Sequence, residues 1–109
     1  MPEYIACHAS DVEPGSVEAV AIDIPGKPLP LALAVIHANS GRWFAVDDRC
    51  SHGRFKLSQG DVEDETIECT RHGSSFDLHT GEAMNPPASA PVKTYQVRVD
   101  GDDVYITVE

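Results

Sequence analysis

Two short segments of this chain each place a cysteine and a histidine close together, and they constrain its fold more than any other feature. The first is Cys50-Ser51-His52, and the second, Cys69-Thr70-Arg71-His72, follows after 16 intervening residues. Each pair is followed directly by a glycine, Gly53 or Gly73, which lets the backbone approach a bound group closely. Two thiolates and two imidazoles form a metal-ligand set, so we expect two loops that grip one metal centre from opposite sides.

Two kinds of metal centre can use this ligand set. A [2Fe–2S] cluster with mixed ligation takes two cysteines on one iron and two histidines on the other. A mononuclear zinc ion could bind the same four side chains and remains the alternative. Zinc modules usually use Cys-x2–4-Cys motifs or histidine pairs at helical spacing, and this chain has neither, which favours the cluster.

Length and charge limit the class of protein. The 109 residues suit one domain, and no apolar stretch approaches the roughly 18–20 residues that span a bilayer. The first residues lack the basic and apolar regions of a signal peptide, so we expect a soluble, cytoplasmic protein without a membrane partner. The net charge of −10 disfavours nucleic acid and favours docking on a basic protein surface. Cys7, the third cysteine, is expected to be a small buried thiol.

The pattern on either side of the Cys/His segments is that of an all-β protein. Eight glycines and eight prolines are scattered through the chain, and no long segment holds a helical period. Strand signals occur at Val17–Ile24, Leu31–His37, Trp43–Val46, Thr94–Val99 and Val104–Val108. Asn39-Ser40-Gly41 and Asp100-Gly101-Asp102-Asp103 supply the turns of two hairpins. We therefore expect an antiparallel β-sandwich or barrel.

The middle of the chain differs from its flanks. Residues 47–90 contain the Cys/His pairs, several glycines and a proline-rich stretch, with short strands expected at Thr66–Cys69 and Ser75–Leu78. We interpret this as a loop-rich insertion into a β base formed by residues 1–46 and 91–109, all within one domain. The stability of the insertion should depend on its metal, because its own apolar content is low.

At this point the chain resembles the Rieske iron–sulfur family. The resemblance is carried by Cys50–Gly53, Cys69–Asp77, Thr80–Glu82 and Asn85–Ala88, and the flanking β pattern extends it over nearly the whole chain. It implies a β-sandwich base with an inserted cluster-binding subdomain and one [2Fe–2S] cluster per chain. Cys50 and Cys69 would bind the inner iron, and His52 and His72 the outer iron near the surface.

The resemblance also assigns residues around the cluster. Asn85–Pro91, with Pro87, would form a proline loop over the third side of the cluster. Apart from the resemblance, Ser74, two residues after His72, is by sequence the best-placed donor of a hydrogen bond to a ligand sulfur; the alternative is an ordinary residue at the start of a strand.

Phe76 stands where cytochrome bc-type Rieske proteins have a tyrosine that donates to a ligand sulfur, and Phe55 and Arg71 stand where those proteins have a disulfide. Fewer donors to sulfur predict a reduction potential toward the low end of the Rieske range of about −150 to +300 mV.

Within the family the chain is most similar to the small ferredoxins of bacterial multicomponent ring-hydroxylating oxygenases. Such a ferredoxin takes one electron from an NAD(P)H-dependent flavoprotein reductase and passes it to the Rieske centre of a terminal oxygenase. The resemblance therefore implies a monomeric electron carrier of aromatic hydrocarbon catabolism and not an enzyme. The alternative within the family is the small subunit of an assimilatory nitrite reductase, although many such subunits lack the four ligands that this chain has.

Two further groups of residues carry expectations. Acidic residues near the ligands are candidates for steering a partner during encounter, namely Asp47, Asp48, Asp61, Glu63, Asp64 and Glu65. His8, His37 and His79 show no grouping with a carboxylate of the kind that binds catalytic iron, so we expect structural roles for them.

Overall fold

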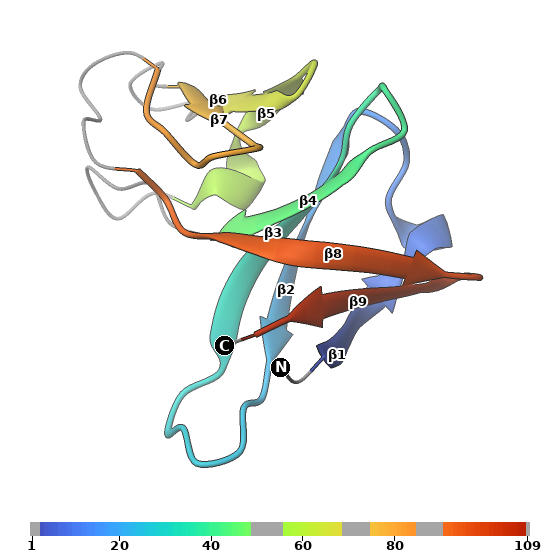
Figure 1. The fold of residues 1–109 in the computed structure, drawn as a ribbon, viewed down its shortest axis with the longest axis vertical. Helices are drawn as coiled ribbons and strands as arrows, with labels where there is room; N and C mark the ends of the chain where they lie inside the picture. Colours follow the sequence, from blue (N-terminus) through green and yellow to red (C-terminus); the bar gives the residue numbers. More distant parts are fainter. Residues whose placement is uncertain (1–2, 49–55, 69–74, 85–90, 109) are drawn as a thin grey trace.

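The computed structural model describes residues 3–48, 56–68, 75–84 and 91–108, and strands dominate these ranges (Figure 1). The strands are β1 (Glu3–His8), β2 (Ser16–Ile22), β3 (Leu31–His37), β4 (Trp43–Asp47), β5 (Asp61–Glu63), β6 (Thr66–Glu68), β7 (Ser75–Asp77), β8 (Thr94–Asp100) and β9 (Asp103–Thr107). Two single-turn 3-10 helices, η1 (Ala9–Asp11) and η2 (Leu57–Gln59), join them. Within these ranges no helix is long and apolar enough to cross a bilayer.

Six of the strands form one curled antiparallel sheet in the order β1-β9-β8-β4-β3-β2. Its two edge strands, β1 and β2, contact each other, so the sheet nearly closes into a barrel (Figure 1). The inner side of the curl holds a core made largely of side chains from β3 and β9, including Leu33, Val35, Val104 and Ile106. The all-β prediction is therefore confirmed.

Both expected hairpins are present. β3 pairs with β4 from Leu33↔Asp47 to His37↔Trp43, and the turn between them contains Gly41 at a φ of +92°. β8 pairs with β9 from Gln96↔Thr107 to Asp100↔Asp103, which leaves Gly101-Asp102 as a two-residue loop with Gly101 at +63°. Such positive φ values are the conformations that favour glycine.

The sequence pattern missed β1. Its apolar run, Tyr4–Cys7, is only four residues long and lies between the polar residues Glu3 and His8. The strand exists because it pairs with β9, and that pairing carries an irregularity between Ile5 and Cys7. The Cys7 thiol is half-buried rather than fully buried, and burial together with nearby carboxylates raises its pKa to about 11.

Strand β3 is buried on both faces, which explains its unbroken apolar sequence. Leu33 and Val35 point into the core of the curled sheet, whereas Ala34 and Ile36 belong to a second core. All four side chains are fully buried. Alternation along a strand sends successive side chains to opposite faces, so a continuous apolar run is expected where both faces are covered.

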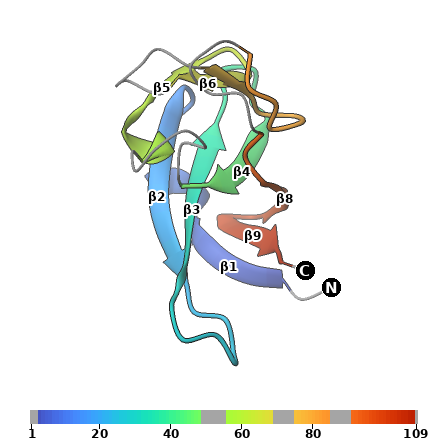
Figure 2. The ribbon, with the colours of Figure 1, turned by 90° about the vertical axis from the view of Figure 1, so that its left-hand side faces the viewer.

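The second core joins β3 and β4 to the part of the chain that contains the Cys/His segments. It contains Ala34, Ile36, Val46, Leu57, Ile67, Phe76, Leu78 and Val92. Three short strands in the order β5-β6-β7 form a separate sheet over this core, at one end of the molecule (Figure 2). β6 and β7 lie where the sequence predicts strands, and β5 is an additional strand paired with β6.

Substitutions on the two faces of β3 should distinguish the contributions of the two cores to stability. We expect Leu33→Ala and Ile36→Ala each to lower the free energy of unfolding by about 2–5 kcal/mol, since both remove fully buried side chains. Urea denaturation followed by circular dichroism measures this loss. Only Ile36→Ala should also speed amide hydrogen exchange in β6 and β7, because Ile36 packs in the second core. Equal exchange in the two variants would contradict the division into two cores.

Candidate metal centre

The four predicted ligands lie outside the described residues. Cys50 and His52 fall in 49–55, and Cys69 and His72 fall in 69–74. Of the other residues predicted around the cluster, Phe76 and Pro91 are described; Gly53, Gly73, Ser74 and residues 85–90, with Pro87, are not. Within the described ranges no three histidine, cysteine, aspartate or glutamate side chains gather as a possible metal site. We call residues 49–55 and 69–74 the first and second ligand segments. The structure describes the framework at the two ends of each segment.

A buried carboxylate closes the base of the first ligand segment. Asp48, at the end of β4, accepts a hydrogen bond from the Ser58 N–H at 2.7 Å and another from the Ser58 hydroxyl at 2.7 Å. The Asp48 N–H in turn donates to the Ala32 carbonyl of β3 at 3.1 Å. Ser58 lies on η2 beside Leu57, which is fully buried in the second core. Both ends of this segment are therefore fixed to the hydrophobic interior.

The second ligand segment connects two paired strands. β6 and β7 pair from Thr66↔Asp77 to Glu68↔Ser75, so residues 69–74 join strand ends that lie side by side. Phe76 anchors this hairpin, because its ring is fully buried in the second core. The Phe76 backbone also bridges to Ala83, which follows the turn after β7.

The bases of the two ligand segments touch each other. A Cβ on Gly60, just after η2, would collide with the carbonyl oxygen of Glu68, the last residue before the second segment. Glycine is therefore needed at position 60 for this close approach of two backbones. The Met84 N–H donates to the Ser75 carbonyl at 2.8 Å, which brings the start of 85–90 to the same end of β7. The framework thus gathers the bases of all three segments that the resemblance assigns to the cluster.

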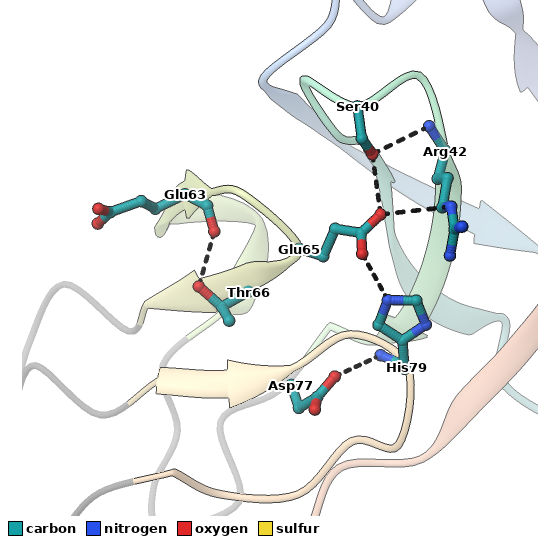
Figure 3. Close-up of polar contacts among 7 residues, drawn as sticks. All are labelled: Ser40, Arg42, Glu63, Glu65, Thr66, Asp77 and His79. Atoms are coloured by element: carbon teal, nitrogen blue, oxygen red, sulfur yellow. Dashed lines mark hydrogen bonds and ion pairs between the residues drawn. The ribbon is translucent and has the colours of Figure 1, made fainter.

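A polar cluster fastens the β5–β7 sheet to the β3–β4 hairpin (Figure 3). Glu65, in the turn between β5 and β6, lies at its centre. One carboxylate oxygen contacts His79 Nε2 at 2.6 Å, and the other accepts a hydrogen bond from the Ser40 hydroxyl at 2.8 Å. Arg42 Nε lies 3.6 Å from the same carboxylate. The hydrogen bonds with His79 and Ser40 hold the pKa of Glu65 below its ordinary value of 4.5.

The histidines outside the motif have structural surroundings. The ring of His79 meets that of Phe44 edge to face, with the centroids 4.9 Å apart. The ring of His37 stacks on Trp43 at 4.0 Å, and its Nδ1 lies 2.9 Å from the Val12 carbonyl. Among the described residues, sequence reasoning missed the pairing of His79 with Glu65, because it joins two turns that are separated in the chain.

Three of the six acidic residues expected to steer a partner have structural partners instead. Asp48 is buried, Glu65 is part of the polar cluster, and Asp47 accepts a hydrogen bond from the Tyr95 hydroxyl at 2.6 Å. The side chains of Asp61, Glu63 and Asp64 are exposed on and beside β5, so they remain candidates for steering.

Comparison with known proteins identifies the family. The model of the Rieske [2Fe-2S] domain matches residues 2–96. This chain belongs to the Rieske [2Fe–2S] family. Among its relatives, the 3-phenylpropionate/cinnamic acid dioxygenase ferredoxin subunit of Escherichia coli (strain K12) is 41% identical over 107 residues, covering 97% of this chain and 93% of the relative.

Solved structures agree with the family. The Sphingomonas yanoikuyae B1 ferredoxin has a TM-score of 0.83 and 34% identity, covering 99% of this Rieske chain and 100% of that one. A chain in the complex of reduced oxygenase and oxidized ferredoxin in carbazole 1,9a-dioxygenase has a TM-score of 0.79 and 31% identity, covering 95% of this chain and 91% of that one. A protein described as an NADH-dependent nitrite reductase small subunit from Mycobacterium tuberculosis is 20% identical with a TM-score of 0.80, covering 96% of this chain and 93% of that one, which shows a shared fold only.

The donor set fits a Rieske cluster. Two cysteine sulfurs and two histidine nitrogens are the ligands such a cluster takes, and they are divided between two segments whose bases the structure holds in contact.

Removing the charge of Glu65 should weaken the attachment of the β5–β7 sheet in a pH-dependent way. Because the pKa of Glu65 is depressed by folding, its ionisation stabilises the protein above pH 4.5, and this contribution is lost as the pH falls through the folded value. We expect the free energy of unfolding of wild type to exceed that of Glu65→Gln at neutral pH, with a difference that shrinks below about pH 4.5. Denaturant titrations across this pH range measure it.

Glu63→Gln is the matched control, because it removes an exposed carboxylate from the neighbouring strand. It should leave the free energy of unfolding at neutral pH close to that of wild type. A Glu65→Gln variant that behaves like this control would show that the polar cluster adds nothing to stability.

Proposed function

We propose that this protein is a one-electron carrier that passes electrons from an NAD(P)H-dependent flavoprotein reductase to a terminal ring-hydroxylating oxygenase. The observation that carries the proposal is the division of two cysteines and two histidines between two segments that start and end on one framework. The relative from Escherichia coli, a dioxygenase ferredoxin subunit that aligns with nearly the whole chain, supports the same role.

Each ligand has a distinct part in this proposal. Cys50 and Cys69 bind the inner iron, and His52 and His72 bind the outer iron toward the surface. One such cluster per chain supplies reversible storage of a single electron. The fully buried Phe76 and Leu57 place hydrophobic packing beneath the two ligand segments, which limits the access of water from the protein side.

A solved complex supports part of the assembly that we propose. The solved complex of an oxygenase with its ferredoxin supports docking of this chain on a terminal oxygenase. We further propose one domain over residues 1–109, a monomer in isolation, and a cytoplasmic location. Exposed carboxylates at Asp61, Glu63 and Asp64 would favour a basic surface on the partner.

Two alternatives receive less support. Likeness to a nitrite reductase small subunit extends to the fold only, at 20% identity. A structural zinc ion would satisfy the same four ligands but would give the protein no redox activity.

Electron paramagnetic resonance at low temperature tests the proposal directly. The purified, oxidised protein should give no paramagnetic resonance signal. After reduction with dithionite it should give one signal with the low average g value of a histidine-ligated [2Fe–2S] cluster. Reduced protein should then be reoxidised by a purified ring-hydroxylating oxygenase and not by a sirohaem nitrite reductase. A colourless protein containing one zinc would overturn the proposal.

The residue at position 76 should contribute to the reduction potential. We expect a midpoint toward the low end of about −150 to +300 mV, because Phe76 has no hydroxyl to donate to a ligand sulfur. Phe76→Tyr should raise the midpoint if the added hydroxyl reaches that sulfur, since a donor stabilises the extra charge of the reduced cluster. Redox titration followed by visible circular dichroism measures both values.

Phe44→Tyr is the control, because it adds the same hydroxyl next to His79 rather than in the hairpin of the second ligand segment. It should leave the midpoint unchanged. A wild-type midpoint near the top of the range would contradict the expectation for Phe76. A stable Phe76→Tyr variant with the wild-type potential would show that a hydroxyl at position 76 does not reach the ligand sulfur.

A further inference from the structure

Two hydrogen bonds join Asp48 and Ser58 across the two ends of the first ligand segment, and we call this pair of bonds the Asp48–Ser58 clamp. Its geometry can orient that segment as well as stabilise the fold. The two residues are ten positions apart, and the segment containing Cys50 and His52 lies between them. Both carboxylate oxygens are used, one by the Ser58 N–H and one by its hydroxyl, each at 2.7 Å. A two-point contact of this kind fixes the orientation as well as the separation of the two ends.

The Asp48–Ser58 clamp is held in place because both of its residues are anchored to the protein interior. The Asp48 N–H is bonded to the Ala32 carbonyl of β3, and Ser58 follows Leu57, whose side chain is fully buried. Asp48 itself is only 8% exposed, so its charge is weakly screened by solvent. Cys50 is only two residues beyond Asp48 in the chain.

We infer that Asp48 is a positioning residue for the cluster, which orients the first ligand segment through Ser58 and lowers the reduction potential through its own charge. The inference rests on the proposed function, because it requires a cluster on Cys50 and His52. A fixed negative charge close to a redox centre disfavours the state that gains an electron. Asp48 therefore acts in the same direction as the missing hydroxyl at Phe76, but from the other ligand segment.

Two substitutions divide the effects of charge and geometry. Asp48→Asn keeps the shape and can still accept from the Ser58 N–H, while its amide can donate to the Ser58 hydroxyl oxygen. Ser58→Ala keeps the charge of Asp48 and the backbone bond but removes the hydroxyl bond. Asp23→Asn is the control for net charge, since Asp23 is exposed and directly follows β2. The end of β2 lies at the opposite end of the molecule from the β5–β7 sheet (Figure 1).

The experiment uses the purified holoprotein of all four forms. We expect Asp48→Asn to shift the midpoint potential upward while Asp23→Asn leaves it at the wild-type value. We expect Ser58→Ala to keep a near wild-type potential but to lose its visible absorbance in chelator on the order of tenfold faster, as loss of a bond to a charged group predicts. These results together would establish both parts of the role.

Other outcomes would overturn the inference. A wild-type potential in Asp48→Asn would show that the buried charge does not act on the cluster, and a wild-type bleaching rate in Ser58→Ala would show that the clamp does not hold the ligand segment. If Asp48→Asn fails to fold, the bleaching rate of Ser58→Ala still decides the positioning role. Absence of the reduction-dependent signal from wild type would instead count against the proposed function, so the two failures are distinguishable.

Discussion

The burial of β3 on both faces is the constraint on which the rest of this molecule depends. Leu33 and Val35 close the core of the curled sheet, and Ala34 and Ile36 close the core beneath the β5–β7 sheet. A single strand is thus shared by two hydrophobic cores. The region that contains the ligand segments therefore packs on β3, the same strand that holds the curled sheet together. The packing of β3 in the base thus also sets the position of this region.

Next to β3 and the second core, contacts between residues close in the sequence fix the positions of the ends of each ligand segment. Asp48 and Ser58 close the first segment, the β6–β7 pairing closes the second, and Gly60 allows the two bases to meet. A Rieske centre needs ligands from both segments on one cluster. A framework that fixes the segment ends leaves fewer conformations to be lost when ligands bind.

Charge in this acidic protein is used in two ways. Glu65 joins the β5–β7 sheet to the β3–β4 hairpin through His79 and Ser40, and Asp48 is built into the base of a ligand segment. Asp61, Glu63 and Asp64 instead remain exposed at the edge strand β5. Unpaired edge strands tend to associate with other strands, and charged side chains oppose this, so the exposed carboxylates also protect the edge.

The sequence by itself determined the chemistry and the class of fold. The spacing of Cys50, His52, Cys69 and His72 predicts the ligand set. Apolar runs around one glycine turn and a period-two pattern around another predict the two large hairpins, because these signals depend on local stereochemistry. Only the tertiary structure decided which polar residues are structural. Asp48, Glu65 and His79 look like ordinary surface residues in the sequence, and β1 has only a four-residue apolar run, Tyr4–Cys7. Their partners lie ten or more positions away in the chain. No local sequence pattern encodes such a contact, because it exists only after the two cores have formed on either face of β3.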